Sequence, residues 1–194
     1  MGGTRLFEGS TNKGLARLMA FIDGGYLRRN FEEKFGNDNI KFDVLKQRLV
    51  QEFDANCNGN FRGDLVRAYY YDAIVDESHP KYKEQDQYFD NIEKINGYEL
   101  RLGDLIPTGK NGTGPLKQKG VDVRLAVDMI TKSNQYDFAI LLAGDGDFLD
   151  SVDIVKEAGK RVFGIYFPDH ISVNLHASLD ARINITNFLN LLKF

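Results

Sequence analysis

Carboxylates gather in this chain where strongly apolar segments end. The four that concern us are Asp23 after residues 18–22, Asp122 at the start of a segment with helical spacing, and Asp145 and Asp147 after residues 138–143. An apolar run followed by Gly and Asp is typical of a buried parallel strand whose carboxyl end opens into a loop, where open α/β sheets bind ligands. Carboxylates gathered there repel one another unless a cation neutralises them, and oxygen ligands suit Mg²⁺ or Mn²⁺. The sequence therefore predicts a metal-dependent enzyme in which these four aspartates are catalytic and bind the metal.

A further acid, Asp128, lies on the same predicted helix as Asp122. The two are six residues apart, which separates their side chains by about 120° on a helix of 3.6 residues per turn. Asp122 could cap the helix or point into the metal site, and we favour it as the ligand. Asp128 is kept as a weaker metal candidate, which either supports the site indirectly or only stabilises the fold.

Each acid also has a purely structural interpretation. Asp23 could only cap the following helix, and Asp145 and Asp147 could form a solvated acidic turn. The second interpretation competes poorly, because these two residues directly follow the most apolar strand. The three histidines lack the spacing of a zinc site, and residues 109–114 lack the residue order of a phosphate-binding loop.

The elements that must position these acids alternate between strands and helices. Strands are predicted over 18–22, 65–71, 98–103, 138–143 and 161–167, and helices over 26–35, from 43 onwards, 80–96, 121–132 and 148–158. Strands this apolar cannot face water, so we expect a parallel sheet covered by helices on both faces. We also expect 98–103 to be an edge strand, and Val123, Val127 and Ile130 to point inward.

Length and composition fit one soluble domain. With 194 residues the chain can bury a sizeable core, and we predict a flexible arm over 1–16 and a single domain over 17–194. Residues 183–194 are predicted to pack on the sheet, with a homo-oligomer contact as the alternative. Cys57 is alone, which excludes an intrachain disulfide. Without a membrane-spanning or signal-peptide segment, we expect a cytoplasmic protein with no membrane partner.

The charge balance does not decide the partner. A net charge of −3 and a pI of about 5.7 would normally argue against nucleic acid. However, acids sequestered around a cation would leave the remaining surface closer to neutral or positive. Lys117, Lys119 and Arg124 flank the loop near the acidic motifs and could contact phosphates.

The motifs, taken in order, resemble the NYN domain of the PIN-like nuclease superfamily, most closely its bacterial LabA-like (DUF88) branch. The matching segments are Phe-Ile-Asp-Gly at 21–24, Tyr-Tyr-Asp at 70–72, Lys-Gly-Val-Asp-Val at 119–123 with Leu-Ala-Val-Asp at 125–128, Leu-Leu-Ala-Gly-Asp-Gly-Asp-Phe at 141–148, and Gly-Lys-Arg-Val at 159–162. The resemblance covers about residues 18–168. It implies a Rossmann-like three-layer sandwich with a mostly parallel central sheet, and an acidic pocket that binds Mg²⁺ or Mn²⁺ and cleaves RNA phosphodiesters.

Carried over by residue, the resemblance implicates Asp23, Asp122, Asp145 and Asp147, and less directly Asp128. At position 26 many relatives have Asn where this chain has Tyr26, which we place with Lys117, Lys119 and Arg124 among the predicted substrate-binding residues. The predicted function is a metal-dependent endoribonuclease that acts on single-stranded or structured RNA.

Two other functions compete with a nuclease. One is a non-catalytic or partner-dependent PIN-like module that binds nucleic acid. The other is a haloacid-dehalogenase-type phosphohydrolase, whose late acidic motif resembles residues 144–147. That class needs an acid two residues after its nucleophilic Asp, whereas Asp23 is followed by Gly24 and Gly25.

Overall fold

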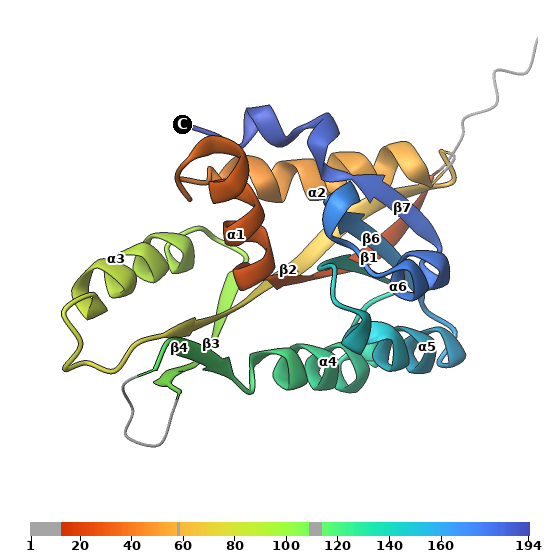
Figure 1. Ribbon diagram of the computed structural model, residues 1–194. Coiled ribbons are helices and arrows are strands. Elements are labelled where there is room, and N and C mark those ends of the chain that lie inside the picture. The colour runs from red at the N-terminus through yellow and green to blue at the C-terminus, as the bar shows by residue number, and fades with distance from the viewer. Residues whose placement is uncertain (1–12, 58, 109–113) are drawn as a thin grey trace, which may run out of the picture.

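The computed structural model describes residues 13–57, 59–108 and 114–194, which form three layers with a sheet in the middle (Figure 1). The sheet built by these residues has seven strands in the order β4-β3-β2-β1-β5-β6-β7. The strands are β1 (Gly14–Asp23), β2 (Phe61–Ile74), β3 (Tyr98–Pro107), β4 (Leu116–Lys119), β5 (Phe138–Leu142), β6 (Arg161–Tyr166) and β7 (Ala181–Asn184). The β3–β4 pair is antiparallel and the other neighbouring pairs are parallel. The predicted α/β class with a mostly parallel sheet is confirmed.

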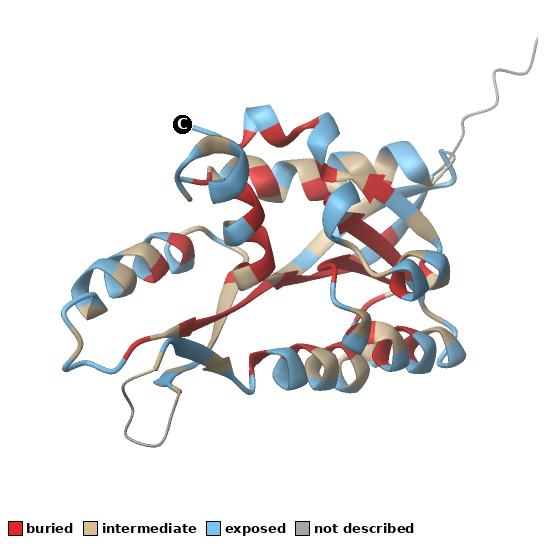
Figure 2. Cartoon of the chain, viewed as in Figure 1, coloured by how far each residue is buried: buried red, intermediate tan, exposed pale blue. Residues whose placement is uncertain are grey.

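Helices cover both faces of the sheet. They are α1 (Gly24–Phe35), α2 (Phe42–Asn56), α3 (Tyr82–Glu93), α4 (Val121–Thr131), α5 (Leu149–Glu157) and α6 (Val173–Ser178). The first three, with the C-terminal residues 185–192, pack on one face, and the last three pack on the other. Figure 2 shows the central strands buried between these layers. Every residue of β5 is buried, which explains why its sequence is uninterrupted by polar residues.

The strand order places the ends of β1, β2 and β5 at one edge of the sheet. β1 lies between β2 and β5 and runs parallel to both. The chain therefore leaves β1 toward one side for β2 and later fills the other side with β5. Such a reversal of strand order opens a crevice at the carboxyl ends, where open α/β sheets hold their ligands.

The inward face of α4 differs from the prediction. Val123 is 68% exposed and Val127 is 49% exposed. Val121, Leu125 and Met129 instead face the sheet at a four-residue spacing, and Ile130 packs partly against the same cluster. Two apolar stripes run along this helix, so sequence periodicity alone could not decide which one is buried.

Two element boundaries also differ from the prediction. β3 is not an edge strand, because β4 pairs with it on its outer side. β4 has only four residues and two of them are exposed lysines, so it gave no strand signal. At the N-terminus β1 already begins at Gly14, so the arm predicted over 1–16 is wrong for residues 14–16, while 1–12 lie outside the described residues.

The C-terminal segment packs back onto the fold as predicted. Ile185, Phe188, Leu189 and Leu192 are all buried within the core cluster of the first face. Whether the chain forms oligomers remains a prediction. None of the helices in the described part of the chain is long and apolar enough to cross a membrane.

Phe53 on α2 is expected to be a main support of the core. Its side chain is fully buried and its ring lies 4.9 Å from that of Phe138 and 5.2 Å from that of Phe163, measured between centroids. We expect Phe53→Ala to lower the free energy of unfolding by about 3–5 kcal/mol, because it removes contacts and leaves a cavity. Urea denaturation would measure the loss. The matched Phe194→Ala, at a ring that is 83% exposed, should change the free energy by less than about 0.5 kcal/mol.

Candidate active site

Asp23 lies where β1 ends and α1 begins. Its Oδ1 accepts a hydrogen bond from the backbone N–H of Tyr26 at 2.9 Å, so the side chain caps the helix. Burial raises the pKa of Asp23 to about 6, and the charges of Asp122 and Asp72 add to the rise. The carboxylate therefore caps a helix and at the same time lies among other acids.

Asp145 and Asp147 lie on a tight turn after β5. Asp145 Oδ1 accepts a hydrogen bond from the backbone N–H of Asp147 at 3.0 Å, and both residues are exposed. Gly144 fixes the start of the turn, because a Cβ there would collide with the carbonyl oxygen of His170 and the ring of Tyr26. Its own carbonyl accepts a hydrogen bond from the N–H of Ser172 at 2.8 Å. Only glycine leaves room for this close approach of three segments.

Asp122 stands in the first turn of α4. Gly120, which precedes the helix, has the left-handed φ of 74° that lets the chain turn out of β4. Partial burial raises the pKa of Asp122, and the charges of Asp145 and Asp147 raise it further. Asp122, at the N-terminal end of α4, therefore lies close to the turn after β5.

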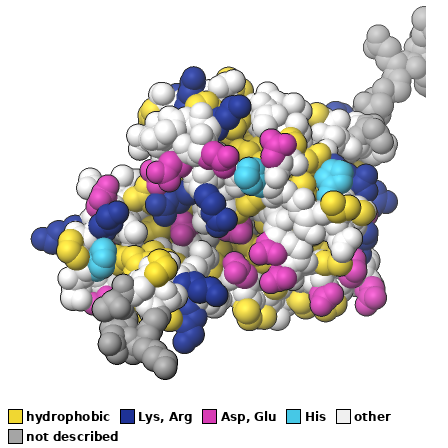
Figure 3. Space-filling view, viewed as in Figure 1, with side chains coloured by type: hydrophobic (Ala, Val, Ile, Leu, Met, Phe, Trp, Pro, Cys, Tyr) yellow, Lys and Arg dark blue, Asp and Glu magenta, His cyan; other side chains and the backbone are white. Residues whose placement is uncertain are grey.

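The structure brings the four sequence-predicted aspartates together. Asp23 is coupled by charge to Asp122, and Asp122 is coupled to Asp145 and Asp147. Arg29 on α1 is the cation that lowers the pKa of both Asp23 and Asp122. Figure 3 shows acidic side chains grouped on this face with Lys and Arg side chains beside them. We call Asp23, Asp122, Asp145 and Asp147 the acidic cluster.

Comparisons with known proteins identify the family. The model of the family described as the NYN domain matches residues 17–186. The chain belongs to the NYN domain family. It is 24% identical over 126 residues to the low amplitude and bright protein LabA of Synechococcus elongatus, which supports the LabA-like branch. That match covers 64% of this chain, which spans about 64% of the length of LabA.

The fold of this NYN domain also matches a solved structure. A protein of unknown function from Vibrio parahaemolyticus superposes with a TM-score of 0.58 over 87% of this chain and 91% of that one, at 19% sequence identity. This likeness supports the fold alone. The family itself belongs to the PIN-like nucleases, so a nuclease that binds nucleic acid is supported at the level of the class.

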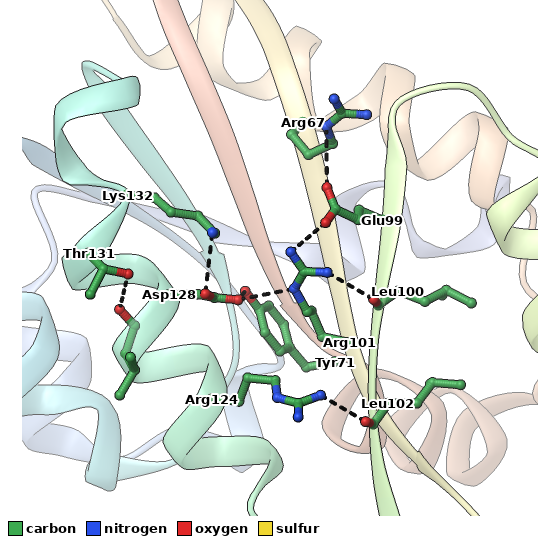
Figure 4. Close-up of polar contacts among 11 residues, drawn as sticks. Arg67, Tyr71, Glu99, Leu100, Arg101, Leu102, Arg124, Asp128, Thr131 and Lys132 are labelled. Carbon is green, nitrogen blue, oxygen red and sulfur yellow. Dashed lines mark hydrogen bonds and ion pairs between the residues drawn. The ribbon is translucent and has the colours of Figure 1, made fainter.

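Asp128 lies outside the acidic cluster of the NYN domain. Figure 4 shows it among partners from three elements. Asp128 Oδ2 accepts a hydrogen bond from the Tyr71 hydroxyl at 2.9 Å and one from Arg101 Nε at 3.3 Å, and Lys132 Nζ lies 3.4 Å from Oδ1. Both of its oxygens are engaged, so this residue takes the structural role, one of the two that the sequence left open. Its placement as a metal candidate is not supported.

Tyr26 is in the core, so its predicted role as a substrate contact is wrong. Its side chain is only 7% exposed, and its ring packs edge-on against Phe167 with centroids 5.6 Å apart. The hydroxyl accepts a hydrogen bond from the backbone N–H of Phe167 at 2.9 Å. Burial raises the pKa of Tyr26 to about 12, so the hydroxyl stays protonated. The residue ties α1 to the end of β6 and thereby holds the helix that follows Asp23.

The three predicted basic contacts lie on exposed surface next to the cluster in sequence. Lys117 and Lys119 are exposed on β4, on either side of Gln118. Arg124 is exposed on α4 and donates a hydrogen bond from Nη1 to the carbonyl oxygen of Leu102 at 2.9 Å. Their binding to substrate remains a prediction.

Sequence reasoning missed Asp72, which lies two residues before the end of β2. It is 5% exposed and accepts hydrogen bonds from Arg28 Nη1 at 3.2 Å, the Tyr70 hydroxyl at 3.2 Å and the N–H of Ala73 at 2.8 Å. Burial raises its pKa, and the charge of Arg28 opposes the rise. The signal was present, because Asp72 follows an apolar and aromatic run near the carboxyl end of β2, much as Asp23 follows residues 18–22 at the end of β1. Asp72 is therefore an acid paired with Arg28 that lies close enough to Asp23 for its charge to raise the pKa of Asp23.

Gln118 on β4 was also missed. Both its Oε1 and Asp23 Oδ1 border the space beside Gly25, at 3.0 and 3.5 Å from the position that a Cβ would take there. Its amide nitrogen is buried and has no hydrogen-bond partner among the described residues. No sequence pattern could have indicated this, because the contact depends on how the β3–β4 hairpin reaches back to α1.

The donor chemistry of the acidic cluster fits a divalent cation. In the described part of the chain, no three His, Cys, Asp or Glu side chains already form a compact ligand set. One oxygen of Asp23 and one of Asp145 are fixed by backbone N–H groups, and the hydrogen bonds found in the described residues leave the other oxygen of each free. Hard carboxylate oxygens gathered within reach of one another's charge are the surroundings that Mg²⁺ or Mn²⁺ stabilises.

The raised pKa of Asp23 predicts how the stability of the fold depends on pH. Because folding favours the protonated carboxyl, the stability that it contributes is full below its ordinary pKa of 3.8 and is lost as the pH rises through about 6. In metal-free buffer, Asp23→Asn should therefore increase the free energy of unfolding by about 1–3 kcal/mol at about pH 7.5, and by roughly half as much at about pH 5. Asn retains the oxygen that caps α1.

Urea denaturation with a chelator present would measure both values. Asp153→Asn, at an exposed position on α5, serves as the control and should have little effect at either pH. A gain from Asp23→Asn that did not grow with pH would contradict the electrostatic explanation.

Proposed function

We propose that this NYN domain is a metal-dependent endoribonuclease that uses Mg²⁺ or Mn²⁺. The observation that supports the proposal most is the meeting of Asp23, Asp122, Asp145 and Asp147 from separate elements, none of which has an ion-pair partner among the described residues. Unpaired carboxylates that repel one another are costly for a fold, so their retention at a ligand-binding edge favours a function.

The acidic cluster would hold the metal. Bound there, such an ion lowers the pKa of water, polarises a phosphate and steadies a leaving oxygen. The protein contributes position: the N–H groups of Tyr26 and Asp147 fix the carboxylates of Asp23 and Asp145. Arg29 supplies positive charge beside the cluster, and Lys117 and Lys119 are exposed on β4 a few residues before Asp122, which suits a phosphodiester. No side chain in this arrangement is required as a covalent nucleophile.

The competing functions require different sets of acidic residues. A dehalogenase-type phosphohydrolase needs an acid at position 25, which is Gly25, and the NYN family is not of that class. A binding module without catalysis would not need the four unpaired acids. That alternative therefore predicts that nucleic-acid binding survives substitution of the cluster while no cleavage occurs in any metal.

Cleavage of labelled single-stranded RNA and matched DNA tests the proposal directly. We expect Mn²⁺ or Mg²⁺ to support RNA cleavage that EDTA abolishes. Asp145→Asn should lower the rate by about 100-fold or more, because metal-ion catalysis contributes several kcal/mol to lowering the barrier. Asp153→Asn, the same substitution at an exposed site on α5, should cut like the parent. RNA binding without cleavage under all these conditions would refute the nuclease.

Metal binding can be tested without any reaction. If the acidic cluster binds Mn²⁺, saturation at about 100 times Kd should stabilise the fold by about 2.7 kcal/mol and raise the melting temperature by about 5–10 °C. The shift should be much smaller in Asp145→Asn and unchanged in Asp153→Asn. An equal shift in all three proteins would place the cation elsewhere.

A further inference from the structure

Four cationic side chains line the junction between α4 and strands β2 and β3 (Figure 4). They are Arg67, Arg101, Arg124 and Lys132, and we call them the basic strip. Figure 4 shows Arg101 between Arg67 and Arg124, with Lys132, the residue after α4, facing it from the other side. Arg67 lies on the same side of β2 as Tyr69 and Tyr71, because side chains alternate along a strand.

The middle of the basic strip is neutralised and rigid. Arg101 pairs with Glu99 and with Asp128, the latter at 3.3 Å, and Lys132 pairs with Asp128 at 3.4 Å. The charged ends of Arg101 and Lys132 also lie over the ring of Tyr69, at 5.1 and 5.2 Å from its centroid. Two carboxylates thus balance these two cations and hold them in place.

The two ends of the basic strip keep their charge available. Arg67 has a 44% exposed side chain and a long ion-pair distance of 3.7 Å to Glu99, which Arg101 also occupies. Arg124 uses one N–H on the backbone of Leu102, and no carboxylate of the described residues pairs with it. A structural network that only held α4 on the sheet would not need these two exposed guanidinium groups.

The basic strip begins at the same end of α4 as the acidic cluster. Arg124 is two residues after Asp122, so the two side chains leave the first turns of the helix on opposite sides, Asp122 toward the turn after β5 and Arg124 toward β3. A strand that passes over this end of α4 can reach both, and from Arg124 the strip runs along the helix to Lys132 and across to Arg67. Exposed arginines that extend from a site suited to phosphodiesters match a chain of phosphates. The overall charge of −3 does not oppose this, because local charge governs such a contact.

We propose that the basic strip binds the phosphate backbone of a single-stranded nucleic acid that continues from the acidic cluster. The inference rests on the proposed function only in taking the cluster as the place of cleavage. It adds that the substrate is a strand of several nucleotides, because Arg67 can be reached only by a chain that extends beyond the cluster. Single strands supply a flexible backbone that can follow the junction of α4 with the sheet.

Substrate length separates the strip from the cluster in an experiment. Binding would be measured by fluorescence anisotropy in the Asp145→Asn background, with labelled RNAs of about 4 and about 16 nucleotides. We expect Arg67→Gln to weaken binding of the longer RNA by about 3- to 10-fold and to leave binding of the shorter RNA unchanged. Arg67→Gln combined with Arg124→Gln should weaken binding of the longer RNA further. It should also make the salt dependence of that binding shallower, by about one phosphate contact per arginine. Arg161→Gln, an exposed arginine at the start of β6, is the matched control.

The outcomes are distinct from those of the nuclease test. Equal losses of affinity for both RNA lengths, or no loss for either, would contradict the proposed role of the basic strip. Neither result would bear on the role of the acidic cluster. Full competition by an acidic peptide would also overturn it, in favour of a protein partner. If the parent protein binds the long RNA through Arg67 but never cuts, the proposed function fails and the strip stands. If it cuts long and short RNAs equally well with and without Arg67, only the strip fails.

Discussion

The repulsion among carboxylates at one edge of a buried parallel sheet is the constraint on which the rest of this structure depends. Three neighbouring strands end together, so acids that follow them cannot avoid one another. Burial raises the pKa values of Asp23 and Asp122, and the charges of neighbouring acids raise both values further. Backbone N–H groups and the close contact at Gly144 hold the carboxylates there in spite of this repulsion.

Several buried or half-buried acids that serve the fold are paired with cations, whereas in the described part of the chain the cluster acids are not. Asp72 pairs with Arg28, Asp128 with Arg101 and Lys132, and Asp137 with Arg17. Among the described residues the four aspartates of the cluster have no such partner, although Arg29 lies close enough to lower the pKa of two of them. The chain contains enough arginine to neutralise more acids, and it places that arginine elsewhere. This distribution is consistent with the divalent cation that we propose for the cluster.

The sequence could predict whatever depends on local pattern, and it could not predict contacts between distant segments. Apolar runs that end in Asp located β1 and β5 and therefore most of the cluster. The burial of Tyr26 depends on Phe167, which is 141 residues away, and the pairing of Asp128 depends on Arg101 from β3. The face of α4 was misjudged because Val123 and Val127 have the same spacing as the buried residues. Gln118 reaches Gly25 only through the β3–β4 hairpin.

The α4 helix unites the two charged surfaces, and its phase explains how. Its buried stripe of Val121, Leu125 and Met129 fixes which residues face outward. Asp122 then stands at the helix start beside the turn after β5, while Arg124 and Lys132 follow on the side of β3. Had Val123 and Val127 been the buried pair, the helix would be rotated and Asp122 and Arg124 would change their neighbours. The packing of a few apolar side chains therefore determines the position of Asp122 in the acidic cluster and the position of Arg124 in the basic strip.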